Sequence, residues 1–309
     1  MKKKGKQIRL SIRKNWQLYV FLLVPVLYII IFKYLPMGGV VIAFKDYKMR
    51  KGIWGSDWVG LKHFVRFFEI YQSKRVITNT LILSFYSIIA GFPVPIIFAL
   101  LINCLRNERF KKIAQSIVCL PHFISTVVMV GILLQVFNTR SGLYGVIGEF
   151  LTGAYPPDIM GSPSGFRHLY IWSGVWQGFG WGSIIYTAAL SGVDPMYHEA
   201  AQIDGATRLQ RIIHIDLPSI LPTIVTMLIL RMGSVMSVGF EKVYLMQNGL
   251  NLSASEVIST YEYSVGLSGS GSSDFSYATA IGLFNSVVNL IMITAVNKIA
   301  RKVGETSLW

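Results

Sequence analysis

Charged residues are scarce in this chain. Of its 309 residues, only 14% are Asp, Glu, Lys or Arg, 52% are hydrophobic, and the mean hydropathy is +0.50. This composition excludes an ordinary soluble domain and is typical of a helical protein that crosses a membrane several times. Acidic residues are the scarcer sign, with 15 Asp and Glu against 29 Lys and Arg. Because the basic residues lie beside apolar runs, the net charge of +14 favours contact with anionic lipid over nucleic acid.

The chain also lacks the residues of a disulfide framework, a nucleotide site and a metal centre. Only Cys104 and Cys119 are present, both in or beside apolar segments, so no disulfide is expected. No Gly-x-x-x-x-Gly-Lys-Ser/Thr sequence occurs, and the five histidines show no His-Glu-x-x-His spacing. We therefore expect no enzymatic activity, no metal and no cofactor in this chain. If ATP and Mg²⁺ drive it, other subunits must bind them.

Six apolar segments are long enough to cross a bilayer, which predicts an all-α polytopic membrane protein with six transmembrane helices. Their approximate ranges are 18–35, 76–105, 113–137, 166–192, 220–246 and 277–296. The sequence Pro36-Met37-Gly38-Gly39 is expected to break the first helix. In the loop that follows, the apolar pattern from Val59 to Phe68 predicts a short amphipathic helix on the outer face of the membrane.

The longest polar interruption lies between the fourth and fifth spans. Its characteristic residues are Glu199-Ala200-Ala201, then Gly205 after three free positions, then Ile215, Leu217 and Pro218 after nine. Asp194 followed by Pro195 predicts the start of a short helix, which Gly205 would end in the left-handed conformation. A second short helix is expected to close at Pro218. An ordinary amphipathic linker between membrane helices is the alternative interpretation.

Polar residues inside the predicted spans are candidates for a translocation path. Arg231 lies near the middle of the fifth span, where a charge is expensive and normally faces the bundle interior or water. Spacings of three and four would place it on one helical face with the following residues: Met227, Ser234, Val238 and Glu241. The alternative is that Arg231 pairs with a carbonyl or a partner subunit and only holds the bundle together.

The fourth and sixth spans carry further candidates. Trp172, Trp176 and Gln177 offer aromatic faces and an amide, which suit sugar rings. Tryptophans near a helix end are, alternatively, anchors at the bilayer surface. Asn285 and Asn289 lie four residues apart on the sixth span, where hydrogen bonding between helices explains them as well as a ligand would.

The polar segment resembles the cytoplasmic coupling loop of bacterial ABC importer permeases. Other stretches are similar to carbohydrate permeases of the maltose-permease superfamily, that of binding-protein-dependent transport system inner membrane components: 32–37, 42–47, 58–61 and 238–245. They look closest to the complex-oligosaccharide branch, the polysaccharide or lipoprotein-associated permease B type. The resemblance assigns these residues to coupling with an ATPase: Glu199, Ala200, Ala201, Asp204, Gly205, Ile215, Leu217 and Pro218.

The resemblance implies import of an oligosaccharide across the bacterial cell membrane by alternating access. It implies four kinds of partner besides the lipid bilayer: a second homologous permease, two cytoplasmic ATPase subunits, an extracellular solute-binding protein and the oligosaccharide. Two alternatives stay open. The same machine could carry an amino acid, a peptide or a phosphodiester. An ion-coupled secondary carrier would need intramembrane acids, of which the chain offers little beyond Glu241.

Orientation and domain boundaries follow from this interpretation. An even number of spans places both termini on one side, and that side must be cytoplasmic if the coupling loop is to meet an ATPase. Seven basic residues and no acid within 1–14 agree with the positive-inside rule, whereas eight basic residues within 45–75 run against it. We expect these segments: a basic tail 1–16, a first span and outer loop 17–75, a permease core 76–298 and a tail 299–309.

Overall fold

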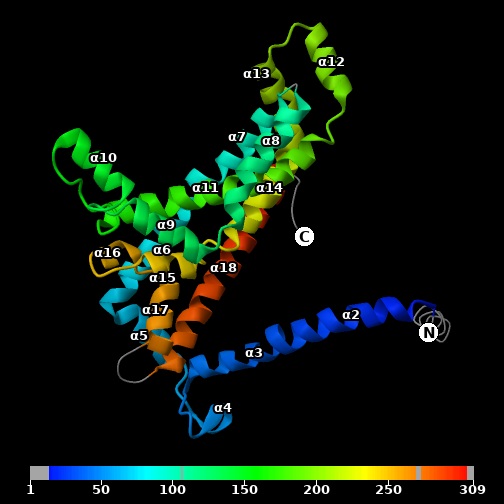
Figure 1. Cartoon of the computed structure of the whole chain (residues 1–309). Coiled ribbons are helices and arrows are strands. Elements are labelled where there is room, and N and C mark those ends of the chain that lie inside the picture. Colours follow the sequence, from blue (N-terminus) through cyan, green and yellow to red (C-terminus); the bar gives the residue numbers. More distant parts are fainter. Residues whose placement is uncertain (1–13, 106, 269–272, 305–309) are drawn as a thin grey trace. The chain divides into compact units, whose positions relative to one another are not determined.

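The computed structural model describes residues 14–105, 107–268 and 273–304, and nearly all regular structure in them is helical (Figure 1). One antiparallel ribbon departs from the all-α expectation. It pairs β1 (Lys45–Asp46) with β2 (Asp57–Trp58). In the described residues, four helices are long and apolar enough to cross a membrane, or five if one bent pair counts as a span.

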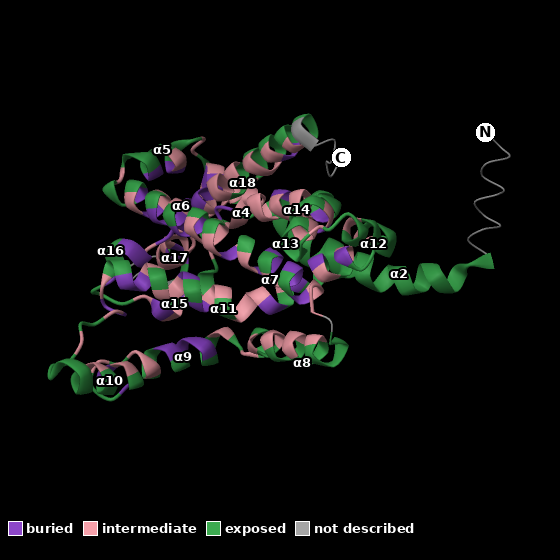
Figure 2. Ribbon diagram, turned by 90° about the horizontal axis from the view of Figure 1, so that it is seen from above, coloured by how far each residue is buried: buried purple, intermediate pink, exposed green. Residues whose placement is uncertain are grey.

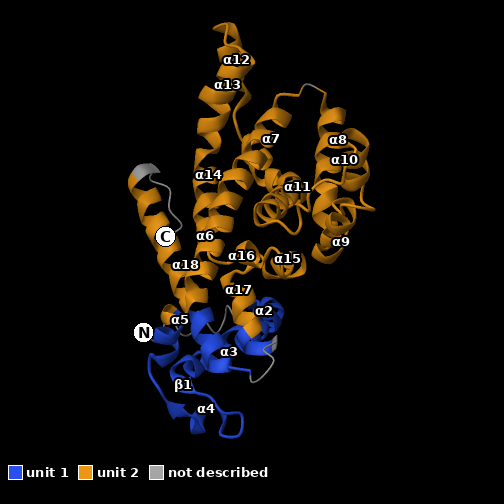
Figure 3. Cartoon of the chain, turned by 90° about the vertical axis from the view of Figure 1, so that its left-hand side faces the viewer, with its two compact units in different colours: residues 1–67, 265–283 blue, residues 68–264, 284–309 orange. Residues whose placement is uncertain are grey.

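The chain divides into two compact units (Figure 3). Unit 1 comprises residues 1–67 and 265–283, and unit 2 comprises residues 68–264 and 284–309.

A continuous helical segment of 29 residues, Trp16–Phe44, begins the described part of unit 1. It consists of α2 (Trp16–Ile29), the π-helix η1 (Ile30–Tyr34), α3 (Leu35–Met37) and the 3₁₀ helix η2 (Gly38–Phe44). The predicted break at residues 36–39 is therefore wrong. Pro36 follows the π-helix η1, a local adjustment that accommodates a proline within a helical segment, and the glycines wind into the tighter η2. Figure 2 shows α2 exposed along its length.

The loop after this helix carries α4 (Gly52–Gly55) and leads into α5 (Lys62–Glu69). The prediction of a short helix here is confirmed, because Phe67 is buried on one side of α5 while Phe68 is exposed on another. In unit 1, the His63 Nε2 atom lies 3.2 Å from the carbonyl oxygen of Lys45, and Arg66 pairs with Asp274 at 2.7 Å. These contacts join the ribbon, α5 and the residues that precede the last helix.

Unit 2 is built around α11 (Pro163–Leu190), which packs against α6 (Tyr71–Gly91), α7 (Pro93–Asn103) and the later helix α14 (Leu217–Met232). Buried side chains form its core: Leu83, Met129, Leu133, Phe166, Ile171 and Val243. The 28 residues of α11 are long enough to span a bilayer, but its glycines, serines and tryptophans leave it outside the apolar candidates.

The predicted third span is bent. It comprises α8 (Glu108–Cys119), the 3₁₀ helix η3 (Leu120–Phe123) and α9 (Thr126–Val136), with a bend of 94° between its two halves. Pro121 opens η3, and the Ser125 hydroxyl accepts a hydrogen bond from the Val128 N–H at the start of α9. The following loop contains α10 (Leu143–Thr152). A proline and a new N-cap explain why one apolar run yields two helices.

The predicted fifth span starts earlier and ends earlier than expected. A helix of 25 residues runs from Arg208 to Met232 through α13 (Arg208–Arg211), the π-helix η4 (Ile212–Asp216) and α14. Pro218 does not close a helix, because it lies in the first turn of α14 behind the wide turn of η4.

Non-helical residues 233–239 then separate α14 from α15 (Phe240–Met246), so the predicted helical face from Met227 to Glu241 does not exist. Gly233 marks this break: a Cβ atom there would lie 2.7 Å from Cδ1 of Ile293. Short helices α16 (Leu252–Ser255), α17 (Ile258–Tyr263) and η5 (Ser264–Ser268) precede α18 (Phe275–Gly304), which contains the predicted sixth span.

Candidate coupling loop and translocation cavities

The polar segment forms a capped helix, α12 (Pro195–Ile203), as its sequence predicts. The Asp194 carboxylate accepts a hydrogen bond from the Met196 N–H at 2.9 Å, and Pro195 occupies the first turn. Gly205 follows the helix with a φ of +77°, a conformation that side chains with a Cβ rarely adopt. Thr207 and Gln210 then form a capping box at the start of α13. Local interactions therefore fix both ends of α12: the Asp194 cap and Pro195 at its start, and the left-handed Gly205 after its end.

One face of α12 is apolar and exposed. Met196, Ala200 and Ile203 recur at spacings of four and three, which places them on the same side of the helix. The exposed fractions of Met196 and Ile203 are 70% and 87%. Glu199 and Asp204 are also exposed, whereas Ala201 is half-buried. The sequence argument singled out the alanines but missed Met196 and Ile203, whose periodicity is visible once the helix start at Asp194 is accepted.

The opposite side of α12 is tied to the next helix. His198 Nε2 lies 3.2 Å from Oδ1 of the buried Asp216, and the Asn103 amide donates to the same oxygen at 3.3 Å. A cavity of about 530 Å³ lies beside these residues and is also lined by Arg208 and Arg211. Ile215, Leu217 and Pro218 lie within the continuous helix, so the closing turn expected there is absent. Within unit 2, α12 and α13 lie at the end opposite to α15–α17 (Figures 1 and 3).

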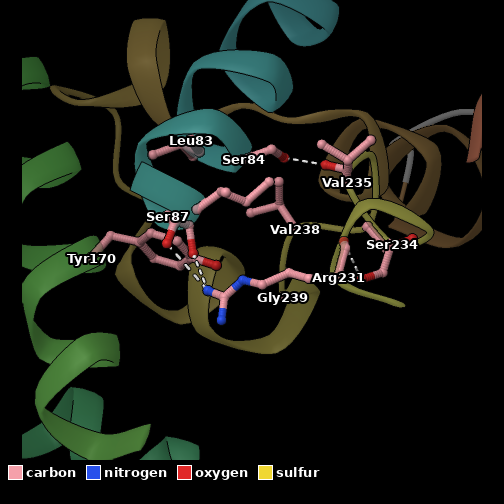
Figure 4. A pocket seen from close by; sticks show the side chains of 11 residues that line it. Leu83, Ser84, Ser87, Tyr170, Arg231, Ser234, Val235, Val238 and Gly239 are labelled. Atoms are coloured by element: carbon pink, nitrogen blue, oxygen red, sulfur yellow. Dashed lines mark hydrogen bonds between the residues drawn. The ribbon is translucent and has the colours of Figure 1, made fainter. Parts of the chain in front are cut away.

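Arg231 lies one residue before the end of α14, not near the middle of the fifth span as predicted, and it borders a cavity of about 310 Å³ in unit 2. Its Nη2 atom donates to the Ser87 carbonyl oxygen at 3.2 Å and to the Ser87 hydroxyl at 3.1 Å. Figure 4 shows the guanidinium group reaching from α14 toward Ser87 of α6, with Tyr170 nearby. The carbonyl contact of the alternative interpretation is present, and the side chain also faces a hollow.

A second cavity, of about 260 Å³, shares Ser87, Tyr170 and Arg231 with the first and adds Lys242 and Gln177 to its lining. Lys242 Nζ donates to the Tyr170 carbonyl oxygen at 3.0 Å and lies 5.1 Å from the centre of the Tyr170 ring. The Gln177 amide donates to the Ile124 carbonyl oxygen at 2.8 Å, next to the bend between η3 and α9. Two cations from different helices therefore border two hollows that share lining residues.

The break between α14 and α15 forms one wall of the first cavity, and side chains hold it in place. Asn289 of α18 accepts from the Met236 N–H at 2.9 Å and donates to the Ser237 hydroxyl at 3.0 Å. Ser84 of α6 donates to the Val235 carbonyl oxygen. These hydrogen bonds satisfy backbone groups that the helix no longer pairs. The structural reading of Asn289 is thus favoured.

The remaining candidates lie elsewhere. Trp172 and Trp176 line an apolar hollow with Met129 and Leu133, and the Trp172 indole donates to the Tyr86 hydroxyl at 3.0 Å. Glu241 is exposed and lines neither of the two Arg231 cavities. The Asn285 Oδ1 atom is buried and has no hydrogen-bond partner among the described residues.

Sequence reasoning missed Lys242 and Tyr170 as cavity residues. The available signal for Lys242 was a lone lysine inside the apolar run that follows Glu241. Tyr170 carries no such signal, because one tyrosine among many aromatic residues is unremarkable until packing places it between the two cations.

Comparison with known proteins assigns the chain to a family. The model of the family described as "Binding-protein-dependent transport system inner membrane component" matches residues 70–305. Two proteins of Bacillus subtilis (strain 168) are similar over almost their whole length. The polygalacturonan/rhamnogalacturonan transport system permease protein YteP is 40% identical over 308 residues, covering 100% of this chain and 95% of its own. Protein LplB is 40% identical over 306 residues, covering 99% and 95%.

Solved structures of similar proteins support the same family assignment. A chain of a bacterial ABC transporter involved in the import of the acidic polysaccharide alginate is 37% identical, with a TM-score of 0.87 and coverage of 96% of this chain and 99% of that one. A chain of the bacterial alginate ABC transporter in complex with an alginate pentasaccharide-bound periplasmic protein is 38% identical, with a TM-score of 0.86 and coverage of 96% and 98%. The present chain belongs to the family of inner membrane components of binding-protein-dependent transport systems and is a multi-pass permease subunit of an ABC importer.

Proposed function

We propose that this permease carries oligosaccharides into the cell and that the segment from Pro195 to Pro218 couples it to separate ATPase subunits. The observation that carries the coupling role is α12, a capped short helix at one end of unit 2 with an apolar face that the described residues leave uncovered. A groove on an ATPase would bury Met196, Ala200 and Ile203. Glu199, Asp204 and Gly205 would fix the edge and the end of that contact.

Six spans with both termini in the cytoplasm fit this function. The proposed spans are the helix 16–44, α6 with α7, the bent pair α8 and α9, α11, the helix 208–232, and α18. The coupling segment then follows the fourth span on the cytoplasmic side. The four basic residues within 106–112 and the three within 298–302 would lie on the same side, in agreement with the positive-inside rule.

The mechanism follows from the way α12 is attached. Two ATPase subunits that bind ATP and Mg²⁺ would close and displace α12 as a rigid body. The His198–Asp216 contact and the continuous helix from Arg208 would pass that displacement into the membrane. A second, homologous permease would complete the path, and an extracellular binding protein would deliver the sugar. The relatives that transport polygalacturonan/rhamnogalacturonan and alginate support a carbohydrate cargo.

Uptake by the reconstituted complex tests this proposal. Proteoliposomes that hold both permeases and the ATPases, supplied with the binding protein, should import an oligosaccharide when ATP is inside and both proton and sodium gradients are collapsed. Import that stops with the gradients, although ATP remains, would reveal a secondary carrier. ATP-driven uptake of an amino acid, a peptide or a phosphodiester, with none of the oligosaccharides offered, would replace the sugar assignment.

A further inference from the structure

The two cavities around Arg231 are lined without any acidic residue. Arg231 borders both of them and Lys242 borders one, and the remaining polar lining comes from hydroxyl, amide and backbone groups. Across the described parts of the chain, no salt bridge involves either cation. Their contacts are all neutral: Ser87 for Arg231, and the carbonyl oxygen and ring of Tyr170 for Lys242.

Two positive charges without a counter-ion are costly at partly buried positions. Neutral hydrogen bonds and a cation–π contact offset only part of that cost. Arg231 is bonded to α6 and Lys242 to α11, so each cation has a packing contact, but neither contact supplies a negative charge. A negatively charged cargo would supply the missing counter-ion and offset the remaining cost of burying the two cations.

We propose that Arg231 and Lys242 form a carboxylate-binding site in the translocation path, and that the cargo is an acidic oligosaccharide built from uronic acid units. This inference rests on the proposed import of oligosaccharides. The planar guanidinium group can hold a carboxylate by two parallel hydrogen bonds, whereas the lysine ammonium group acts as a mobile point charge. Successive carboxylates along a sugar chain could therefore engage the two cations in turn. The solved relatives from an importer of the acidic polysaccharide alginate agree with this charge.

The site must bind weakly. A path that held each carboxylate tightly would slow release, so favourable entry has to be balanced against exit. Bonds to Ser87 and Tyr170 keep both cations partly engaged when no carboxylate is present, which lowers the net gain from binding one. We therefore expect selectivity for charge with modest affinity.

The test compares a pentasaccharide of galacturonic acid with the same chain after its carboxyl groups have been reduced to alcohols. Equilibrium binding is measured on the complete transporter in nanodiscs, without the binding protein, so that only the membrane path selects. The wild type should bind the acidic form roughly tenfold or more tightly than the neutral one. Arg231→Gln and Lys242→Gln should each weaken acidic binding by roughly tenfold and leave neutral binding unchanged. Lys112→Gln, an exposed lysine on α8, should match the wild type.

A readout that needs no substitution guards against variants that fail to assemble. Raising the ionic strength should weaken binding of the acidic pentasaccharide to the wild type and leave the neutral one unaffected. Equal wild-type affinity for the two forms, or equal salt dependence, overturns the inference. In proteoliposomes, import of the neutral form alone would sink the carboxylate site and leave oligosaccharide import standing. Import of neither form, with uptake of a glycerophosphodiester instead, would overturn both.

Discussion

At the scale of single residues, Asn289 shows how this membrane protein tolerates a break in a helix. Its amide oxygen accepts the N–H of the buried Met236, and its amide nitrogen donates to Ser237. Asn285, one turn earlier on α18, has a buried amide oxygen for which the described part of the chain offers no hydrogen-bond donor. The two asparagines look equivalent in sequence but do different work in the fold.

Asn289→Ala should lower the stability of the purified complex by about 1–3 kcal/mol, because a buried N–H loses its acceptor. Asn285→Ala is the matched control and should change stability little, since its amide oxygen has no hydrogen bond to lose. Thermal unfolding in the same detergent measures both. Equal effects from the two variants would contradict the role given to Asn289.

Glu262 in α17 gives a prediction about pH. Burial raises the pKa of its carboxyl group above the ordinary value of 4.5. The folded state thus holds the proton to higher pH than the unfolded state does, so the stability contribution is complete below pH 4.5 and is lost as pH rises through the folded pKa. Glu262→Gln should therefore raise the thermal midpoint at neutral pH and leave it nearly unchanged near pH 4. A midpoint difference that is the same at both values would show that ionisation is not the cause.

At the scale of elements, the coupling role proposed for α12 depends on the backbone geometry at its C-terminal end, and it needs no reactive side chain. No described residue has an atom within 4 Å of a Cβ built on Gly205, so a larger side chain would strain the backbone at φ +77° without a clash. Gly153 after α10 is a matched position, with a φ of +74° and equally open space.

Gly205→Val should uncouple the transporter, because a changed helix end would misplace α12 against the ATPases. We expect ATP hydrolysis to persist while sugar uptake in proteoliposomes falls by roughly tenfold or more, as small displacements at a coupled site are costly. Gly153→Val carries the same backbone strain and should keep uptake near the wild-type level. Unimpaired uptake by Gly205→Val would remove α12 from the coupling mechanism.

Helix starts could be predicted from the sequence better than helix breaks. Asp194-Pro195 and Gly205 mark the ends of α12, since caps and a left-handed turn are local properties. Hydropathy, by contrast, runs unchanged through the bend after Phe123 and through the break at Gly233. Proline misled twice in the same way: Pro36 and Pro218 are expected to end helices, yet both lie inside continuous helical segments directly after a π-helix that accommodates them.

The candidate path was predictable only in part. Arg231 is visible as a charge in an apolar run, but its meeting with Lys242 depends on how α14, α15 and α11 pack. Glu241 and Lys242 are neighbours in sequence, yet only Lys242 lines the cavity. No local pattern decides which of two adjacent polar residues a short helix turns inward.

At the scale of the whole molecule, six spans predict which loops a reagent can reach from outside. In intact cells stripped of the outer wall, a membrane-impermeant maleimide should label Gly153→Cys, because its loop would be extracellular. Lys14→Cys, Ile203→Cys and Arg301→Cys should react only after permeabilisation. All four positions are exposed, so accessibility within the protein does not limit the reaction.

The background for this test replaces Cys104 and Cys119 by serine. Both are only partly buried and free, so the parent without them should stay unlabelled while transport is retained. Labelling of the Ile203 variant from outside would invert the topology and leave α12 out of reach of any cytoplasmic ATPase.

The continuous helix from Arg208 to Met232, which includes the π-helix η4, connects the coupling segment with the Arg231 cavities. Its 25 residues span roughly 35 Å at 1.5 Å per residue, about the thickness of a bilayer. It starts three residues after Gly205 and ends one residue after Arg231. A displacement of α12 would therefore move the whole helix, including the Arg231 guanidinium group at its other end. One helix would then connect the movement of the ATPase subunits with the group proposed to bind the cargo's carboxylates.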